Sequence, residues 1–350
     1  MNASSNKSHY YCFDILNIIA SFAVVVLHCN GSVHTYSPTR TWAASLLIEV
    51  LFFWAVPVFF MLTGAKTLNY RERYSTAEFL IKRMLRIFCP FLAWSFILYL
   101  LRFGVLGNGF ESLSLPEFVS LFMNNGIEPT YWFFFSMFGV TLSIPVLSLL
   151  NKNKRIVHYM IVSAFVFSSL MPYLFAFVDL PWNKEISICI VTSYSMYVLL
   201  GFTLLNSSKT FDNGKYLWLT IGAGACFVIR YGYTLYSSHM LGEVDRLLFD
   251  YGAFTAVVPS VWVYVTFLKF EHRFQKLSDI ACQIIQCFSN AAFGIYLVHK
   301  ILLDNILCGF FGFSMFDLTF RFWAPFVVYL ASFALVLCLK KIPLVKAIVP

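Results

Sequence analysis

Four polar residues follow one face of the first apolar stretch, and the last of them is a histidine. The stretch covers 13–29 and carries no charge between Asp14 and His28. At about 3.6 residues per helical turn, Asp14, Asn17, Ser21 and His28 fall on one side of a helix. A neutral imidazole can take a proton from a hydroxyl, as a general base does. His28 is therefore a candidate catalytic residue; the alternative is a histidine that simply meets water at the outer interface.

A carboxylate in the second apolar stretch is placed to orient this imidazole. Glu49 lies among Leu, Ile, Val and Phe residues, where an unpaired carboxylate is costly. If the chain turns back near 31–42, Glu49 lies roughly one helical turn deeper than His28. A carboxylate that holds one imidazole nitrogen leaves the other free as a base, so we predict that Glu49 assists His28. The alternative is that Glu49 pairs with Arg230 or Arg102.

A basic patch precedes the third apolar stretch. Arg83 and Arg86 are three residues apart, a spacing that places both on one face of an α-helix. Two guanidinium groups on one face can grip a phosphorylated ligand in forked geometry. The alternative is that they anchor the chain to anionic lipid headgroups.

Other polar and aromatic residues cluster at the opposite ends of the apolar stretches. Ionisable groups in a membrane usually face a protein interior or a wet cavity, so we expect these to line one polar pocket open to the outside. They are His28, Glu49, Arg102, Arg230, Asp250, His299, Lys300 and Arg321. We predict that Arg230 and His299 contact the substrate there. Trp132 can stack on a sugar ring, although aromatic residues also gather at membrane interfaces without that role.

Composition identifies the elements that carry these residues as membrane helices. Charged residues make up 12% of the chain, whereas soluble domains carry roughly 25%. The mean hydropathy is +0.74. We predict an all-α polytopic membrane protein in which residues 1–350 form a single domain. Ten spans are expected, at about 13–30, 43–64, 85–102, 131–150, 157–178, 186–205, 216–236, 247–268, 287–308 and 320–339.

The charges indicate orientation and exclude some functions. Most of the 25 Lys and Arg residues fall between alternate pairs of spans, which predicts that both termini lie in the cytoplasm. The net charge of +8 then reflects cytoplasmic loops and does not indicate a nucleic-acid partner. The nine cysteines have no metal-ligand spacing, so no metal is expected. The connection 103–130 is expected to be either a plain loop or a cover for an outer cavity.

Five motifs in order resemble the acyltransferase-3 family of integral membrane acyltransferases, in particular its polysaccharide-modifying branch. The first is the Asp–x–Leu to His pattern of residues 14–28. The others are AVPVFFMLTG, FLIKRMLRIFCP, WFF to Pro, and GIYLVH, at 55–64, 79–90, 132–145 and 294–299. Together they extend over most of the chain.

The resemblance implies transfer of an acyl group, often acetyl or succinyl, from cytoplasmic acyl-CoA. The acceptor would be a hydroxyl of a cell-envelope or exocellular polysaccharide or of its lipid-linked precursor, at the plasma membrane. Carried onto this chain, the family pattern makes His28 the catalytic residue, and Arg83 and Arg86 the residues that contact the CoA phosphates. Besides acyl-CoA and the glycan, the expected partners are membrane lipids.

One departure from the family pattern concerns Asn17. The family usually has Arg at this position, eleven residues before the histidine and on its face. Asn17 can hydrogen-bond to a substrate but carries no charge, so either another cation substitutes, or donor handling is altered, or the chain is not an active transferase. The alternative function is transport of a lipid-linked glycan or a small metabolite. Transporters commonly show broken helices and paired repeats, and no repeat is visible in this sequence.

Overall fold

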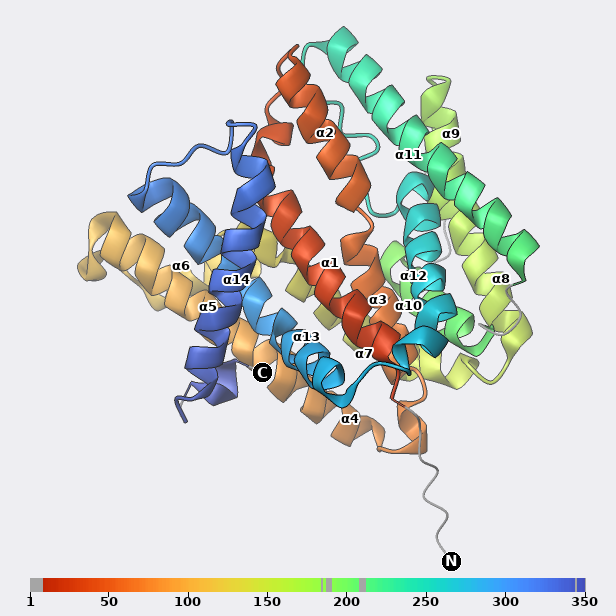
Figure 1. Ribbon diagram of the computed structural model, residues 1–350, viewed down its shortest axis with the longest axis horizontal. Helices are drawn as coiled ribbons and strands as arrows, with labels where there is room; N and C mark the ends of the chain where they lie inside the picture. Colours follow the sequence, from red (N-terminus) through yellow and green to blue (C-terminus); the bar gives the residue numbers. More distant parts are fainter. Residues whose placement is uncertain (1–8, 184, 187–190, 208–211, 344, 350) are drawn as a thin grey trace, which may run out of the picture.

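The computed structural model describes an all-helical membrane protein (Figure 1). The residues described are 9–183, 185–186, 191–207, 212–343 and 345–349, with the backbone alone at 108 and 112. Within these ranges there is no β-strand. Eight helical segments are long and apolar enough to cross a membrane: Tyr11–Cys29, Arg40–Glu72, Thr76–Gly107, Pro129–Leu150, Lys154–Phe177, Phe254–Phe274, Asp279–Phe310 and Phe320–Lys340. The predicted fold class is confirmed.

Two of the ten predicted spans, 186–205 and 216–236, fall on helices outside this set. They correspond to α10 (Ser193–Ser207) and α11 (Asn213–Leu241). A span needs about 20 residues, and α10 has 15. Residues 187–190, on which the prediction also falls, lie outside the described residues. The count of ten spans stays a prediction.

Helix α1 (Tyr11–Cys29) lies in the middle of the bundle (Figure 1). It packs against α3 (Ala55–Thr67), α12 (Phe254–Phe274), α13 (Asp279–Lys300) and α14 (Phe320–Lys340). Because α1 is surrounded by protein, its polar residues can find partners that lipid does not offer. The helix that carries His28 is therefore an interior wall of the bundle.

The second predicted span is not one continuous helix. α2 (Arg40–Phe52) ends at Phe52, and α3 begins at Ala55. Pro57 gives the physical reason, because a proline lacks the N–H for an i→i−4 bond and its ring clashes with the carbonyl of the residue four before it, here Phe53. The break lets α2 and α3 point in different directions.

The segment that carries the two arginines departs from a regular α-helix. α4 (Thr76–Arg83) passes into α5 (Cys89–Tyr99) through a π-helical segment, Met84–Phe88. Pro90 would clash with the carbonyl of Arg86 in an α-helix, and the wider π turn relieves that contact. The side chains after Arg83 are thereby shifted around the helix axis. Arg83 and Arg86 nevertheless line the same cavity, as the prediction that they share one helix face requires.

The remaining helices complete the bundle. They are α6 (Leu115–Met123), α7 (Trp132–Leu150), α8 (Lys154–Ala164) and α9 (Met171–Phe177), with π-helical segments at Leu100–Asn108, Phe165–Leu170 and Ile301–Phe310. The connection 103–130 is not a plain loop, because it contains α6. Phe118 and Phe122 of α6 are buried and stack around Phe91 and Tyr99 of α5. α6 therefore folds back onto α5.

The first turn of α1 and the last turn of α14 lie at the end of the bundle where α4 is found. Lys66, at the end of α3, lies 5.9 Å from the ring centroid of Phe13 in α1. Lys340 of α14 interacts electrostatically with Arg86. We call this the α4 end. That it faces the cytoplasm stays a prediction.

Helices α3 and α10 approach each other closely through two glycines. A Cβ on Gly64 would lie 1.9 Å from the Val198 carbonyl oxygen, and a Cβ on Gly201 would lie 2.0 Å from that of Met61. No side chain fits at either position. Small residues that let backbones meet in this way stabilise helix pairs in membranes, where van der Waals packing replaces the hydrophobic effect.

Gly201→Ala is expected to lower the free energy of unfolding by about 1–3 kcal/mol or more, because the methyl group forces the two helices apart. Thermal unfolding in detergent, followed by circular dichroism, measures the loss. The matched control is Gly139→Ala in α7, whose Cβ meets nothing within 4 Å. That control is expected to leave stability unchanged or to raise it by up to about 1 kcal/mol. Equal stability of the two variants would contradict the packing described.

Candidate functional site

His28 is hydrogen-bonded to a second histidine. His28 lies in the last turn of α1 and His299 in the last turn of α13. Nδ1 of His28 lies 2.6 Å from Nε2 of His299, and the two ring planes differ by 10°. His299 is fully buried, whereas His28 is partly accessible. The pair therefore exposes one imidazole and hides the other.

The partners of the pair determine which nitrogen is free. His299 Nδ1 lies 2.7 Å from the carbonyl oxygen of Tyr296, which can only accept, so this nitrogen carries a proton. In a neutral imidazole the other nitrogen accepts, and His299 Nε2 thus accepts the proton that His28 donates from Nδ1. Nε2 of His28 keeps its lone pair. His299 is placed as a positioning residue that holds His28 in the tautomer of a general base.

Glu49 does not hold His28, contrary to the pairing predicted from the sequence. Within the part of the chain that is described, no hydrogen bond joins the two side chains, and His299 occupies Nδ1. Glu49 is buried beside Asn30 and interacts electrostatically with Arg230. One of its carboxylate oxygens has no partner. The assumption that α2 folds back along α1 predicted Glu49 as the partner of His28. The partner is instead His299 of a third helix, α13.

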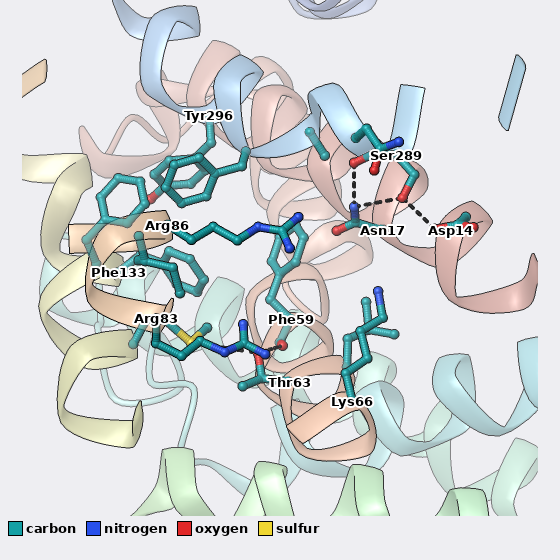
Figure 2. A pocket seen from close by; sticks show the side chains of 17 residues that line it. Asp14, Asn17, Phe59, Thr63, Lys66, Arg83, Arg86, Phe133, Ser289 and Tyr296 are labelled. Carbon is teal, nitrogen blue, oxygen red and sulfur yellow. Dashed lines mark hydrogen bonds between the residues drawn. The ribbon is translucent and has the colours of Figure 1, made fainter. Parts of the chain in front are cut away.

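A cavity of about 320 Å³ is lined by residues of α1, α3, α7 and α13 and by the two arginines (Figure 2). Lys66, Arg86 and Asn290 on its wall are solvent-exposed, so the cavity opens at the α4 end. Phe134 and Tyr296 also line it and are buried. The cavity therefore runs from an open, basic mouth to a closed, aromatic floor.

Tyr296 connects the floor of this cavity to the histidine pair. Its ring centroid lies 6.4 Å from that of His28 and 5.5 Å from that of His299. Its hydroxyl donates to the carbonyl oxygen of Thr130 over 2.6 Å, which fixes the ring. A ligand that fills the cavity as far as Tyr296 thus ends next to the His28–His299 pair.

Three cations line the mouth. Arg83 and Arg86 were predicted from the sequence, and the third is Lys66 of α3. None of the three forms an ion pair with a carboxylate among the described residues. In Figure 2 the guanidinium of Arg86 and the amine of Lys66 both extend into the space between the helices. The mouth is suited to a ligand with more than one negative charge.

Asn17 lies on the cavity wall and joins α1 to α13. Its side-chain nitrogen donates to the backbone oxygen of Ser289 over 3.0 Å and to the hydroxyl oxygen over 3.2 Å. The Ser289 hydroxyl in turn donates to Asp14 over 2.8 Å. The side-chain oxygen of Asn17 lies on the side of Arg86 (Figure 2). Asn17 can therefore contact a ligand through this oxygen while its nitrogen stays hydrogen-bonded to Ser289 of α13.

Trp132 and Arg230 belong to one stack of side chains near the far end of the bundle. Trp132 stacks on Tyr251 at 5.5 Å between ring centroids, and Tyr251 stacks on Phe53 at 4.2 Å. The guanidinium of Arg230 lies 3.5 Å from the Phe53 ring centroid and donates to the carbonyl oxygen of Leu248. The structure thus brings the two predicted residues into one aromatic cluster.

Most residues of the single outer pocket predicted from the sequence form local pairs, and that they line one pocket stays a prediction. Arg102 bonds to Glu128 and lies 3.6 Å from Asp304, which also accepts from Lys300. The remaining two pairings are also local: Asp250 accepts from Tyr173, and Arg321 donates to the carbonyl oxygens of Thr41, Met315 and Phe316. The proposed alternative partner Arg102 is likewise not bonded to Glu49. The cavity that the described residues form lies instead on the α4 side.

Sequence reasoning missed three residues of the site. Lys66 was counted only as a basic residue near a membrane surface, and nothing in its spacing links it to Arg83. Tyr296 and Ser289 belong to a helix more than 250 residues from α1. Two histidines at corresponding ends of two spans were the one sequence signal that could have joined α1 to α13.

Comparison with known proteins gives a family match. A family model described as an acyltransferase domain matches residues 10–340, nearly the whole chain. The match includes the helices that carry the histidine pair and the three cations. Neither the curated proteins nor the solved structures provide a significant match.

Removing His299 is expected to change the tautomer of His28. In His299→Ala, His28 Nδ1 loses its acceptor, and the proton is expected to redistribute between the two nitrogens. Nitrogen chemical shifts of histidine-labelled protein report this directly, with His28→Gln used to assign the signal. The control is His158→Ala, which removes an exposed histidine on α8. An unchanged His28 signal in His299→Ala would show that His299 does not fix the tautomer.

Proposed function

Because the chain belongs to the acyltransferase domain family and is a multi-pass membrane acyltransferase, we propose that it takes its acyl group from acyl-CoA and passes it to a glycan hydroxyl. Acetyl and succinyl are the groups proposed for transfer. The proposed acceptor is a cell-envelope or exocellular polysaccharide or its lipid-linked precursor. The plasma membrane is the proposed location.

The observation that carries this proposal is the course of the cavity. Its mouth has three cations that lack carboxylate partners among the described residues, and its floor is Tyr296, which contacts both histidines. Acyl-CoA has the matching shape: phosphates at one end, a long thin arm, and a thioester at the other end. With the phosphates on Arg83 and Arg86, the arm would extend along Phe133 and Phe134 toward Tyr296.

In the proposed reaction His28 acts as a general base. Its Nε2 takes the proton of the acceptor hydroxyl while the hydroxyl oxygen forms a bond to the thioester carbonyl carbon. The carbon–sulfur bond then breaks, and the thiolate of CoA receives that proton from the imidazolium. The products are an ester and CoA with a free thiol. His299 keeps the imidazole oriented throughout and donates nothing to the substrate.

The acceptor is proposed to approach from the side of Trp132. Trp132 is the partly exposed end of its stack with Tyr251 and Phe53, and its ring is of the kind on which sugar rings pack. Glu49 and Arg230 lie beside it, both buried, and support this cluster from behind. The catalytic part foreseen for Glu49 becomes, in this proposal, a supporting part in the acceptor site.

The proposal is tested with purified protein in nanodiscs, acetyl-CoA or succinyl-CoA, and a thiol reagent that detects released CoA. Wild type is expected to release CoA only when a crude envelope-glycan extract is present. His28→Ala is expected to lower the rate at least about 100-fold, since general bases contribute about 10²–10⁴-fold. Arg83→Ala is expected to raise the apparent KM for the donor about tenfold, because it removes a charged contact to phosphate.

Lys152→Ala is the matched control, since it removes an exposed cation between α7 and α8, away from the cavity. Its rates are expected to equal those of wild type. Full activity in His28→Ala would refute the assignment of the base. Folded wild-type protein that releases no CoA with either donor and a broad acceptor extract would contradict the proposed donor and acceptor.

A further inference from the structure

Lys66 lines the same cavity as Asn17, the residue at which this chain departs from the family pattern. Lys66 lies in the last turn of α3, and both it and Asn17 of α1 line the cavity. In Figure 2 its amine points toward Asn17 and Asp14. An ammonium carried on α3 thus reaches the region that a longer cationic side chain at position 17 would reach.

The only carboxylate on the cavity wall does not neutralise Lys66. Among the 17 lining residues, all of them described, Asp14 is the single acid. One Asp14 oxygen accepts from Ser289 over 2.8 Å, and the other lies 2.5 Å from His9. Lys66 interacts with Asp14 electrostatically but forms no ion pair with it. The ammonium therefore stays available to a ligand.

The arrangement concentrates positive charge in a confined space. Arg83 and Arg86 are the nearby like charges that act on Lys66. Three cations against one carboxylate repel one another, which raises the free energy of the empty cavity, and an anion that binds between them relieves this repulsion. Lys66 lies on the α3 wall, whereas the arginines extend from α4 and the π-helical segment. A bound anion would thus be contacted from two sides.

We infer that Lys66 is a third donor-binding residue, which replaces from α3 the cation that the family pattern places at position 17 of α1. It holds a phosphate group of the donor together with Arg83 and Arg86. The inference rests on the proposed function, because it assigns Lys66 to the same donor site. It also resolves the departure at Asn17: the charge is present but is carried by a different helix.

The test measures binding of CoA itself, without acceptor, by isothermal titration calorimetry in nanodiscs. Lys66→Met keeps the length of the side chain and removes its charge, and it is expected to weaken CoA binding about tenfold. The decisive variant is the double one, Asn17→Arg with Lys66→Met. It returns a cation to the same cavity, now from α1, and is expected to restore most of the affinity. Lys269→Met is the charge control. It removes a partly exposed lysine of α12 that does not line the cavity, and it is expected to bind CoA like wild type.

The outcomes separate this inference from the proposed function. If wild type binds CoA and Lys66→Met binds it equally well, the part given to Lys66 is overturned while the donor stands. If the double variant binds no better than Lys66→Met, substitution of one cation for the other is overturned. If folded wild type binds no CoA, both the donor and the inference fall. Melting temperatures of all variants show that the affinities compared belong to folded protein.

Discussion

The structure depends on two polar links between α1 and α13. Asn17 bonds to Ser289 near one end, and His28 bonds to His299 near the other. The links are 11 residues apart on α1 and 10 on α13, so the two helices run parallel, with a similar rise of about 15–17 Å between the links. Polar groups between packed helices have few alternative partners, and a slip of one residue would break both links. The two links fix the wall between cavity and histidine pair.

The treatment of charge differs between the two ends of the bundle. Toward the far end, Arg102, Glu128, Asp304 and Lys300 neutralise one another. At the α4 end, Lys66 and the two arginines have no such partners among the described residues. Pairing makes a charge part of the scaffold, whereas an unpaired charge beside a cavity is available to a ligand.

The sequence predicted what depends on local periodicity and composition. The helical class, the interior face of α1 and the importance of Arg83 and Arg86 near one opening follow from apolar runs and spacing. Tertiary partners did not follow: His299 lies 271 residues from His28, and no helical period relates them. The π-helical segment before Pro90 and the break before Pro57 interrupt helices that the apolar runs alone predict to be regular. Lys66 was hidden because a cation at a span's end has an ordinary explanation in membrane topology.

The first helix also sets a condition on how the protein is made. The amides of Tyr11 and Cys12 donate to the carboxylate of Glu271. On the polar face of α1, Asn17 bonds to Ser289 and His28 bonds to His299. Each of these partners emerges from the ribosome long after α1 has been synthesised. Until then, Asp14 and His28 lie in an apolar helix without their final bonds, which favours shelter beside other protein over exposure to lipid. The helices α12 and α13, which supply these partners, can pack against α1 only after most of the chain has been synthesised. The site is therefore completed at about the same time as the chain.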